Sequence, residues 1–259
     1  MTNTSIWEFG DMKLPVAVHW IGRYSPRKRT NPTFRPMPET VLLELPYLPP
    51  VSWCALLWQA EAVTLEACEN FQKGSYRNRC HIIGPNGLQR LTVPLAKGKH
   101  QQTPIREVRI SHDENWPLVH WRSIEAAYGR SPFFEHYGPE LRLFYEKKWD
   151  LLFDFNLALL RFLLKKMGWP GQITLSETYL KRSQPPAPGD FRDAVSPKNE
   201  AAPAWFRPVR YPQVFAERHG FVPDLSVLDL LFCCGKQSGE WLMDGGRLAA
   251  GGGRQNPSG

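Results

Sequence analysis

The segment from Trp149 to Met167 constrains the fold of this 259-residue chain more than any other part of it. Its residues are apolar on most sides of a helix, and Gly168 and Pro170 follow it as stop signals. Its apolar run is interrupted by Asp154, Asn156, Arg161, Lys165 and Lys166. Because a bilayer-spanning helix needs ~20 predominantly apolar residues, this segment is too polar to cross a membrane. We expect a long helix buried at the centre of the domain, and no membrane span.

The chain before this helix carries the patterns of short strands. Segments 79–83 and 88–94 flank the sequence GPNG, in which Asn86 and Gly87 supply the positive φ angles of a tight turn, so we predict a β-hairpin. Apolar runs or alternation predict further strands at residues 41–45, 62–68 and 105–110. A short helix is expected between the first two of these strands, over residues 51–60.

The chain after residue 115 changes to helical spacing. We expect a helix over 115–129, a second helical piece that begins at Ser131 and breaks at Gly138 and Pro139, and a short helix within residues 223–235. Residues 183–204 contain five prolines and predict a loop. Strands early and helices late indicate an α/β fold with a mixed sheet and a hairpin in the N-terminal half, and α+β is the alternative.

The two ends of the chain lack apolar periodicity. Residues 1–40 mix Pro, Arg and Thr, and residues 241–259 are rich in Gly, so we expect disordered extensions around a single domain at 41–240. The apolar run at Val41 also suggests Met37 as an alternative start. No basic cluster followed by an apolar run marks a secretory signal, so we expect a cytoplasmic protein.

Charge and cysteine content exclude several classes of function. The net charge is +7, but the two ends supply +4 of it, which weakens a nucleic-acid hypothesis because a DNA-binding face concentrates charge on a folded element. The five cysteines contain no Cys-x-x-Cys spacing and are interpreted as buried small residues. No nucleotide-binding, redox or zinc-hydrolase motif is found. We therefore expect neither a metal nor a cofactor.

Two polar segments are candidates for ligand binding. In residues 71–79, FQKGSYRNR, polar side chains precede a predicted strand: Gln72, Lys73, Arg77, Asn78 and Arg79. These side chains could converge on an anionic or amide-bearing ligand, and a solvated loop explains them equally well. Lys97, in the loop AKGKHQQT, could meet a phosphate, although lysine-rich loops usually stay solvated.

His120 is the candidate general base. His120 and Ser123 are three residues apart and would share a helix face that Tyr128 flanks, and a histidine so placed can exchange a proton near neutral pH. A packed or exposed histidine without a catalytic role is the commoner case. Near the C-terminus, Ser226 and Asp229 have the spacing of a helix capping box, which explains both without a function.

Several short motifs together resemble the WbqC-like protein family. They are LPYLPP, NFQKGSYRNR, LTVPL, YGRSPFFEHY and YPQVF…GFVPDLSVLDLLF, in order from Leu45 to Gly235. The resemblance implies an association with bacterial O-antigen and other surface-polysaccharide gene clusters, and a glycine transferase activity has been suggested for the family. Two departures are visible: Leu45 replaces the Gln usual before PYLP, and the stretch before YPQVF is shorter than in many members.

The resemblance also implies a set of site residues. Carried over by position, they are Tyr47, Gln72, Asn78, Arg79, Tyr128, Tyr137, Gln213 and Asp229.

The resemblance, together with the polar segment 71–79, implies a transferase that acylates an amino sugar during surface-polysaccharide synthesis, with glycylation as one form of this reaction. Such a reaction needs a base for the sugar ammonium, donors for the oxyanion and cations for a phosphate-bearing partner. His120 is the expected base, Asn78 and Gln72 the expected donors, and Lys73, Arg79 and Lys97 bind the substrate, for which we expect a nucleotide-linked amino sugar. The alternative is a non-catalytic binding or scaffold protein of a polysaccharide assembly pathway.

Overall fold

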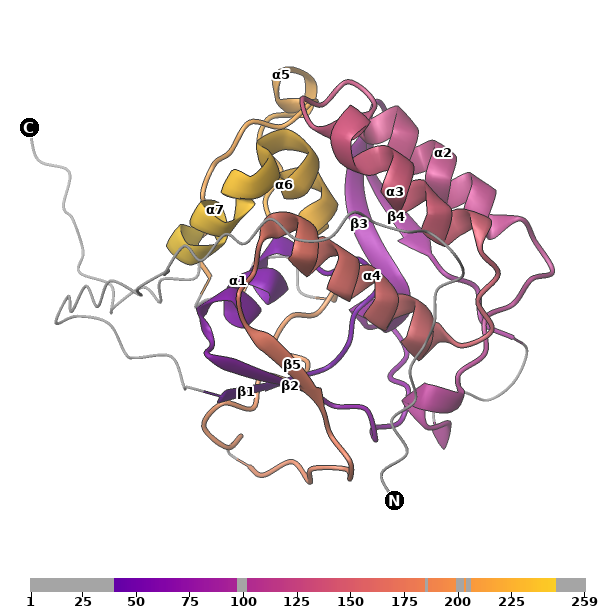
Figure 1. The fold of residues 1–259 in the computed structure, drawn as a ribbon, viewed down its shortest axis with the longest axis vertical. Coiled ribbons are helices and arrows are strands. Elements are labelled where there is room, and N and C mark those ends of the chain that lie inside the picture. Colours follow the sequence, from indigo (N-terminus) through magenta and orange to yellow (C-terminus); the bar gives the residue numbers. More distant parts are fainter. Residues whose placement is uncertain (1–39, 97–101, 185, 199–202, 204–205, 246–259) are drawn as a thin grey trace, which may run out of the picture. The chain divides into compact units, whose positions relative to one another are not determined.

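The computed structural model describes residues 40–96, 102–184, 186–198, 203 and 206–245 (Figure 1). The strands are β1 (Thr40–Leu43), β2 (Ala62–Leu65), β3 (Arg79–Gly84), β4 (Gly87–Thr92) and β5 (Gln172–Leu175). The helices are α1 (Val51–Gln59), α2 (Trp116–Tyr128), α3 (Phe134–Glu146), α4 (Leu152–Met167), α5 (Ala216–His219), α6 (Val227–Cys234) and α7 (Ser238–Gly245).

The strands form two separate sheets. Strands β1, β2 and β5 make a parallel sheet in that order, with Val41 opposite Val63 and Val63 opposite Ile173. Strands β3 and β4 form the predicted antiparallel hairpin, with Gly84 opposite Gly87 at its turn. Of the two residues expected to have a positive φ, Gly87 does (φ +104°) and Asn86 does not. The expected combination of parallel and antiparallel strands with helices is confirmed, but the two kinds of strand do not share one mixed sheet. Strand β5, only four residues long, was not predicted.

Most residues of helix α4, which runs diagonally across the view in Figure 1, are buried in the core, as its composition predicts. Its exposed residues, Asp154, Arg161 and Lys165, recur at helical spacing and form one narrow stripe, while its other faces pack in the core. Asn156 is buried and donates from Nδ2 to the Arg77 carbonyl at 2.7 Å, which explains the polar residue inside this helix. No helix among the described residues is long and apolar enough to cross a membrane.

Two expected elements are wrong. Helix α3 continues through Gly138 and Pro139, because its buried face of Tyr137, Leu141 and Tyr145 packs in the core and offsets the hydrogen bond that proline removes. Residues 105–110 do not form a strand, and Ile105–Glu107 make a turn of 3-10 helix. Arg106 and Glu107 stand between Ile105 and Val108, so the apolar residues do not alternate as a strand requires. They are three residues apart, which is the repeat of a 3-10 helix, and both side chains are buried.

The expected domain ends also shift. Strand β1 begins at Thr40, and helix α7 continues to Gly245 beyond the expected end at 240, with Leu242 fully buried. Residues 241–245 therefore belong to the domain rather than to the Gly-rich tail. Met37 and the remainder of both predicted extensions lie outside the described residues.

Gly168 ends α4 in the left-handed region at φ +78°, and a Cβ added there would meet nothing within 4 Å. Only the backbone conformation opposes a side chain at this position. We expect Gly168→Ala to lower the free energy of unfolding by about 1 kcal/mol and Gly168→Asn to lower it by less, because Asn tolerates this conformation. Urea titrations of both variants measure the difference, and an equal loss for the two would contradict this explanation.

Candidate functional site

The polar segment 71–79 leads into β3 and forms one wall of a pocket of about 300 Å³, here called the strand-end pocket. Its lining comes from this segment and from the end of β4: Phe71, Lys73, Gly74, Asn78, Arg79, Thr92, Val93, Pro94 and Leu95. The structure thus brings the predicted residues Lys73, Asn78 and Arg79 together. Gln72 does not line the pocket; it is exposed and donates to the Asn70 carbonyl at 3.4 Å. Lys97 lies outside the described residues.

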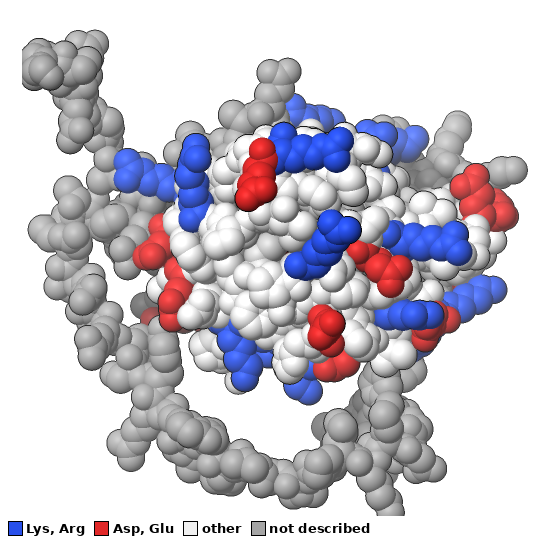
Figure 2. All heavy atoms as spheres, turned by 90° about the horizontal axis from the view of Figure 1, so that it is seen from above, with Lys and Arg blue, Asp and Glu red and all other residues white. Residues whose placement is uncertain are grey.

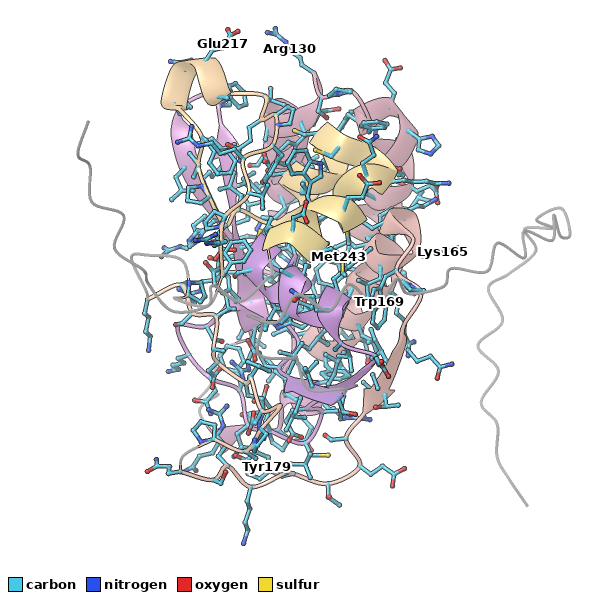
Figure 3. All side chains as sticks on the ribbon, turned by 90° about the vertical axis from the view of Figure 1, so that its left-hand side faces the viewer. Arg130, Lys165, Trp169, Tyr179, Glu217 and Met243 are labelled. Atoms are coloured by element: carbon cyan, nitrogen blue, oxygen red, sulfur yellow. The ribbon has the colours of Figure 1, made fainter. Side chains whose placement is uncertain are left out.

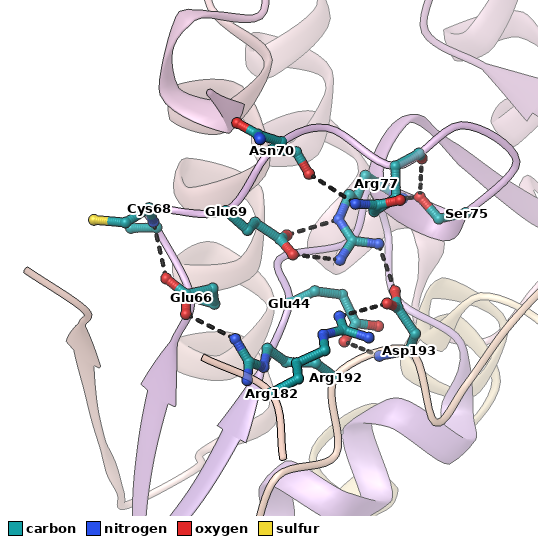
Figure 4. Close-up of polar contacts among 12 residues, drawn as sticks. Glu44, Glu66, Cys68, Glu69, Asn70, Ser75, Arg77, Arg182, Arg192 and Asp193 are labelled. Atoms are coloured by element: carbon teal, nitrogen blue, oxygen red, sulfur yellow. Dashed lines mark hydrogen bonds and ion pairs between the residues drawn. The ribbon is translucent and has the colours of Figure 1, made fainter. Parts of the chain in front are cut away.

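Arg77 does not line this pocket, and its guanidinium lies in a buried network of charges (Figure 4). Its guanidinium donates to both Glu69 carboxylate oxygens, at 2.7 and 2.6 Å, and to Asp193 Oδ1 at 2.7 Å. Arg77 is fully buried and Glu69 nearly so. Because every polar end of Arg77 is used inside the protein, its role is to hold the polar segment in place.

A second buried pair anchors the loop before Val195. Glu66, which directly follows β2, accepts from Arg192 Nη1 at 2.9 Å, and Arg192 also binds Asp190. The carboxylates of Glu66 and Glu44 follow neighbouring parallel strands, so the loop that carries Arg192 closes over the carboxyl edge of the sheet.

His120 lies in the aromatic core rather than in a site. Its Nδ1 is 2.9 Å from the Tyr47 hydroxyl, which is 2.8 Å from the hydroxyl of Tyr145. Burial lowers the pKa of His120 to about 4, and the Thr92 backbone, which accepts from the ring, opposes this only in part. A neutral, buried histidine does not reach a substrate, so the expected general base does not fit this position. Tyr47, a predicted substrate-binding residue, is buried with it.

His120, Ser123 and Tyr128, expected on or beside one face of α2, do not share one environment. Ser123 is partly exposed and donates to the Val119 carbonyl at 2.9 Å, whereas His120 and Tyr128 face the core. Tyr137 is also buried, on α3, and lines neither of the two cavities described here.

Two of the remaining predicted residues, Gln213 and Asp229, meet in one buried network. Gln213 donates from Nε2 to Asp229 Oδ2 at 2.9 Å and pairs with both the N–H and the carbonyl of Val222. Burial raises the pKa of Asp229 to about 6, against the lowering effect of Tyr211, Gln213 and Tyr128. Asp229 is therefore not the second half of a capping box. Ser226 does cap α6, accepting from the Leu228 N–H at 3.3 Å.

Above this network a cavity of about 850 Å³ opens at the β3–β4 turn, here called the turn cavity. Its walls come from the end of α2, the segment before α5, α5 itself and α6, and include Pro85, Ala126, Ala127, Pro132, Pro212, Gln213, Val214, Phe215 and Cys233. Four charged residues complete it: Glu125, Arg130, Glu217 and Arg218. None of the ion pairs among the described residues includes any of these four.

The four charged residues of the turn cavity are exposed. Figure 3 shows Arg130 and Glu217 at the same end of the domain, both projecting outward from the chain. The face that carries α5 and the hairpin turn, seen in Figure 2, has basic and acidic side chains interspersed around an uncharged area. This mixture of signs fits a small ligand that bears both charges, and differs from the single-sign face that nucleic acids require.

The two cavities lie at opposite ends of the hairpin. Arg79 pairs with Thr92 at one end and Gly84 with Gly87 at the other, which separates the ends by ~17 Å. The predicted site residues therefore do not share one place: Lys73, Asn78 and Arg79 line the strand-end pocket and Gln213 lines the turn cavity. His120, Tyr47 and Tyr137 line neither cavity. The charged residues of the turn cavity were missed, and only Arg130, inside the motif YGRSPFFEHY, carried a signal that could have found it.

The described residues offer little for metal or thiol chemistry. Within the described ranges no group of three or more His, Cys, Asp and Glu side chains is placed to hold a metal ion. Cys233 lines the turn cavity, but burial, with Asp229 and Cys234 nearby, raises the pKa of its thiol well above the ordinary value. The thiol stays protonated at neutral pH, which disfavours it as a nucleophile.

Comparisons with known proteins bear on the identity of the chain. A family model described as the WbqC-like protein family matches residues 46–187, more than half of the chain. An uncharacterized protein of Mycobacterium tuberculosis, Rv1507c, is 25% identical over 230 residues, which cover 80% of this chain and 98% of that protein. No solved structure matches the chain.

Proposed function

Because the chain belongs to the WbqC-like protein family, we propose that it is a transferase of surface-polysaccharide biosynthesis that acylates a nucleotide-linked amino sugar. Membership of the family suggests a role in surface-polysaccharide biosynthesis and no more. The reaction, an acyl transfer of which glycyl transfer is one form, is our proposal. The turn cavity is the site where the sugar nucleotide binds.

The observation that carries this proposal is the charge set of the turn cavity. Arg130 and Arg218 can bind the diphosphate of a sugar nucleotide, while Glu125 and Glu217 can bind the ammonium of its amino sugar. All four lack an ion pair among the described residues, so their charges are available to a ligand. The volume of about 850 Å³ lies within the range of small-molecule sites.

Two segments that carry the resemblance also converge on this cavity. Arg130 and Pro132 belong to YGRSPFFEHY, and Gln213 belongs to YPQVF, more than eighty residues later. Beneath them Asp229 fixes the Gln213 amide, which in turn holds the backbone at Val222. The buried network therefore shapes the floor of the cavity and has no need to touch the substrate.

The chemistry follows from these side chains. A carboxylate of Glu125 or Glu217 accepts a proton from the sugar ammonium, and the free amine attacks the carbonyl carbon of an activated acyl donor such as a thioester. The new C–N bond forms as the bond from the carbonyl to the leaving group breaks, and the leaving group departs as a thiol after it takes up a proton. The proposed route transfers the acyl group directly from donor to amine, and the raised pKa of the Cys233 thiol is consistent with this, since it disfavours an acyl-enzyme at that residue.

A thermal-shift screen of the full chain tests the proposal. The panel contains a nucleoside-diphosphate amino sugar, its N-acetylated counterpart, the nucleotide alone, glycyl and other acyl donors, and a short oligonucleotide. A ligand at one hundred times its Kd stabilises a protein by about 2.7 kcal/mol, so a shift is measurable. We expect the amino-sugar nucleotide to give the largest shift, and product analysis by mass spectrometry to show one added acyl group when a donor is supplied.

Variants of the cavity supply the controls. Arg130→Gln and Arg218→Gln should each weaken binding of the sugar nucleotide about tenfold, and Glu125→Gln should weaken the amino form more than the N-acetylated form. Arg122→Gln removes an exposed arginine on the same helix outside the cavity and should change nothing. Binding without turnover would support the scaffold alternative, and a shift with the oligonucleotide alone would contradict both.

A further inference from the structure

We propose that the strand-end pocket is a second ligand site, which binds a small phosphorylated hydroxy compound through Arg79, Lys73 and Lys198. The proposal does not depend on the proposed function, because this pocket and the turn cavity lie at opposite ends of the hairpin. The ends of the hairpin are ~17 Å apart, and the two cavities share no lining residue.

Three cations gather at this pocket from different parts of the chain. Lys73 and Arg79 line it directly. Lys198 reaches over Gly74, since a Cβ added to Gly74 would lie 2.9 Å from Lys198 Cε and 3.6 Å from its Nζ. None of the ion pairs among the described residues includes any of the three. A phosphate monoester carries close to two negative charges at neutral pH and matches this set better than a single carboxylate does.

Two of the residues that line the pocket also carry buried polar atoms that need partners. Asn78 is 6% exposed and donates from Nδ2 to the Val93 carbonyl at 3.0 Å. Its Oδ1 and the Nε of Arg79 have no hydrogen-bond partner among the described residues. A buried polar atom without a partner costs free energy, so such atoms are expected where a ligand binds.

These two atoms define the ligand further. Because Nδ2 is committed to Val93, the free atom of the Asn78 amide is an acceptor, and it needs a donor such as a hydroxyl. The Arg79 Nε is a donor and needs an acceptor such as a phosphate oxygen. A phosphate ester of a hydroxy compound supplies both.

The electrostatics of Arg79 agree with this geometry. Burial and the neighbouring Arg90 both lower the pKa of Arg79, which means that both disfavour its charged form when no anion is bound. An anion at the pocket offsets both effects. The volume of about 300 Å³ suits a single small ester rather than a whole sugar nucleotide.

Isothermal titration of the full chain with glucose 1-phosphate as the probe tests the proposal, with glucose, glucuronate and inorganic phosphate as comparison probes. We expect glucose 1-phosphate to bind, inorganic phosphate to bind more weakly, and glucose and glucuronate to bind at least tenfold more weakly than the phosphate ester. Arg79→Gln should weaken binding of glucose 1-phosphate at least tenfold. Lys73→Gln and Lys198→Gln should each weaken binding of glucose 1-phosphate several-fold. Both lysines are exposed, so these variants test the proposal if Arg79→Gln fails to fold.

Arg130→Gln in the turn cavity is the matched control and should leave this binding unchanged. The proposal is overturned if the wild-type chain does not bind glucose 1-phosphate, if glucuronate binds equally well, or if Arg130→Gln weakens the binding as much as Arg79→Gln does. Loss of sugar-nucleotide binding at the turn cavity, measured separately, would count against the proposed function alone.

Discussion

Replacing Arg77 by Met is expected to lower the free energy of unfolding by about 3–5 kcal/mol. The side chain of Arg77 is fully buried and is the cation that faces Glu69 at 2.6 Å and Asp193 at 2.7 Å. Methionine fills similar space but leaves the Glu69 carboxylate buried without its partner. Breaking a buried ion pair therefore costs far more stability than breaking a solvent-exposed one.

Arg182→Gln is the matched control. Arg182 binds the other oxygen of Asp193 at 2.5 Å, but its side chain is 41% exposed, so its loss should cost less than about 1 kcal/mol. The double variant Arg77→Met with Glu69→Leu removes both buried charges and should recover much of the stability. Denaturant titrations of the three variants measure these differences, and equal losses for Arg77→Met and Arg182→Gln would refute the assignment of the network to the core.

Replacing Glu44 by Gln is expected to stabilise the protein more at high pH than at low pH. The free energy of unfolding of Glu44→Gln minus that of the wild type should be larger at about pH 8 than near pH 4.5, by on the order of 3 kcal/mol. Burial raises the pKa of Glu44 from 4.5 to about 7; Arg77 opposes this increase, and Asp193 adds to it. The single positive charge of Arg77 is already shared between Glu69 and Asp193, so Glu44 is the third carboxyl group around one cation.

The sign of this pH dependence follows from proton binding. Between pH 4.5 and about 7 the folded state keeps the Glu44 proton while the unfolded state has lost it. The protonated group therefore contributes stability at low pH, and this contribution is lost as the pH rises through the folded-state value of about 7. Gln cannot ionise and can still accept from the Asp193 N–H, which Glu44 accepts at 2.9 Å.

Free energies of unfolding of the wild type and Glu44→Gln at several pH values between about 4 and 8 measure this effect. Glu61→Gln replaces an exposed carboxyl group at the start of β2 and should show no such trend. A difference between Glu44→Gln and the wild type that does not change with pH would show that Glu44 ionises normally in the folded protein.

The local elements of this fold could be predicted from the sequence because each depends on neighbouring residues. Helix α4 follows from its apolar spacing and Gly168, and the hairpin follows from the turn sequence GPNG, in which Gly87 alone has the expected positive φ. The limits of such patterns are also clear: Pro139 predicts a break that the buried face of α3 overrides. Strand β5 has the same four-residue length as β1 and β2, but none of its side chains is fully buried, so its apolar pattern is weaker than theirs.

The candidate site depends on contacts that no local pattern encodes. The polar segment predicts a ligand site, and Lys73, Asn78 and Arg79 do line one pocket, but Arg77 between them turns into the core because Glu69 and Asp193 meet it there. His120 has the residue type of a base.

The environment of His120, with Tyr47 and Tyr145 from distant segments, removes the proton exchange that a base requires.

The sequence by itself determined which segments are helix, hairpin and loop, since those depend on periodicity and turn chemistry along the chain. Only the tertiary structure decided which polar residues are buried with a partner and which remain available to a ligand, because burial and charge pairing join residues that are far apart in the chain.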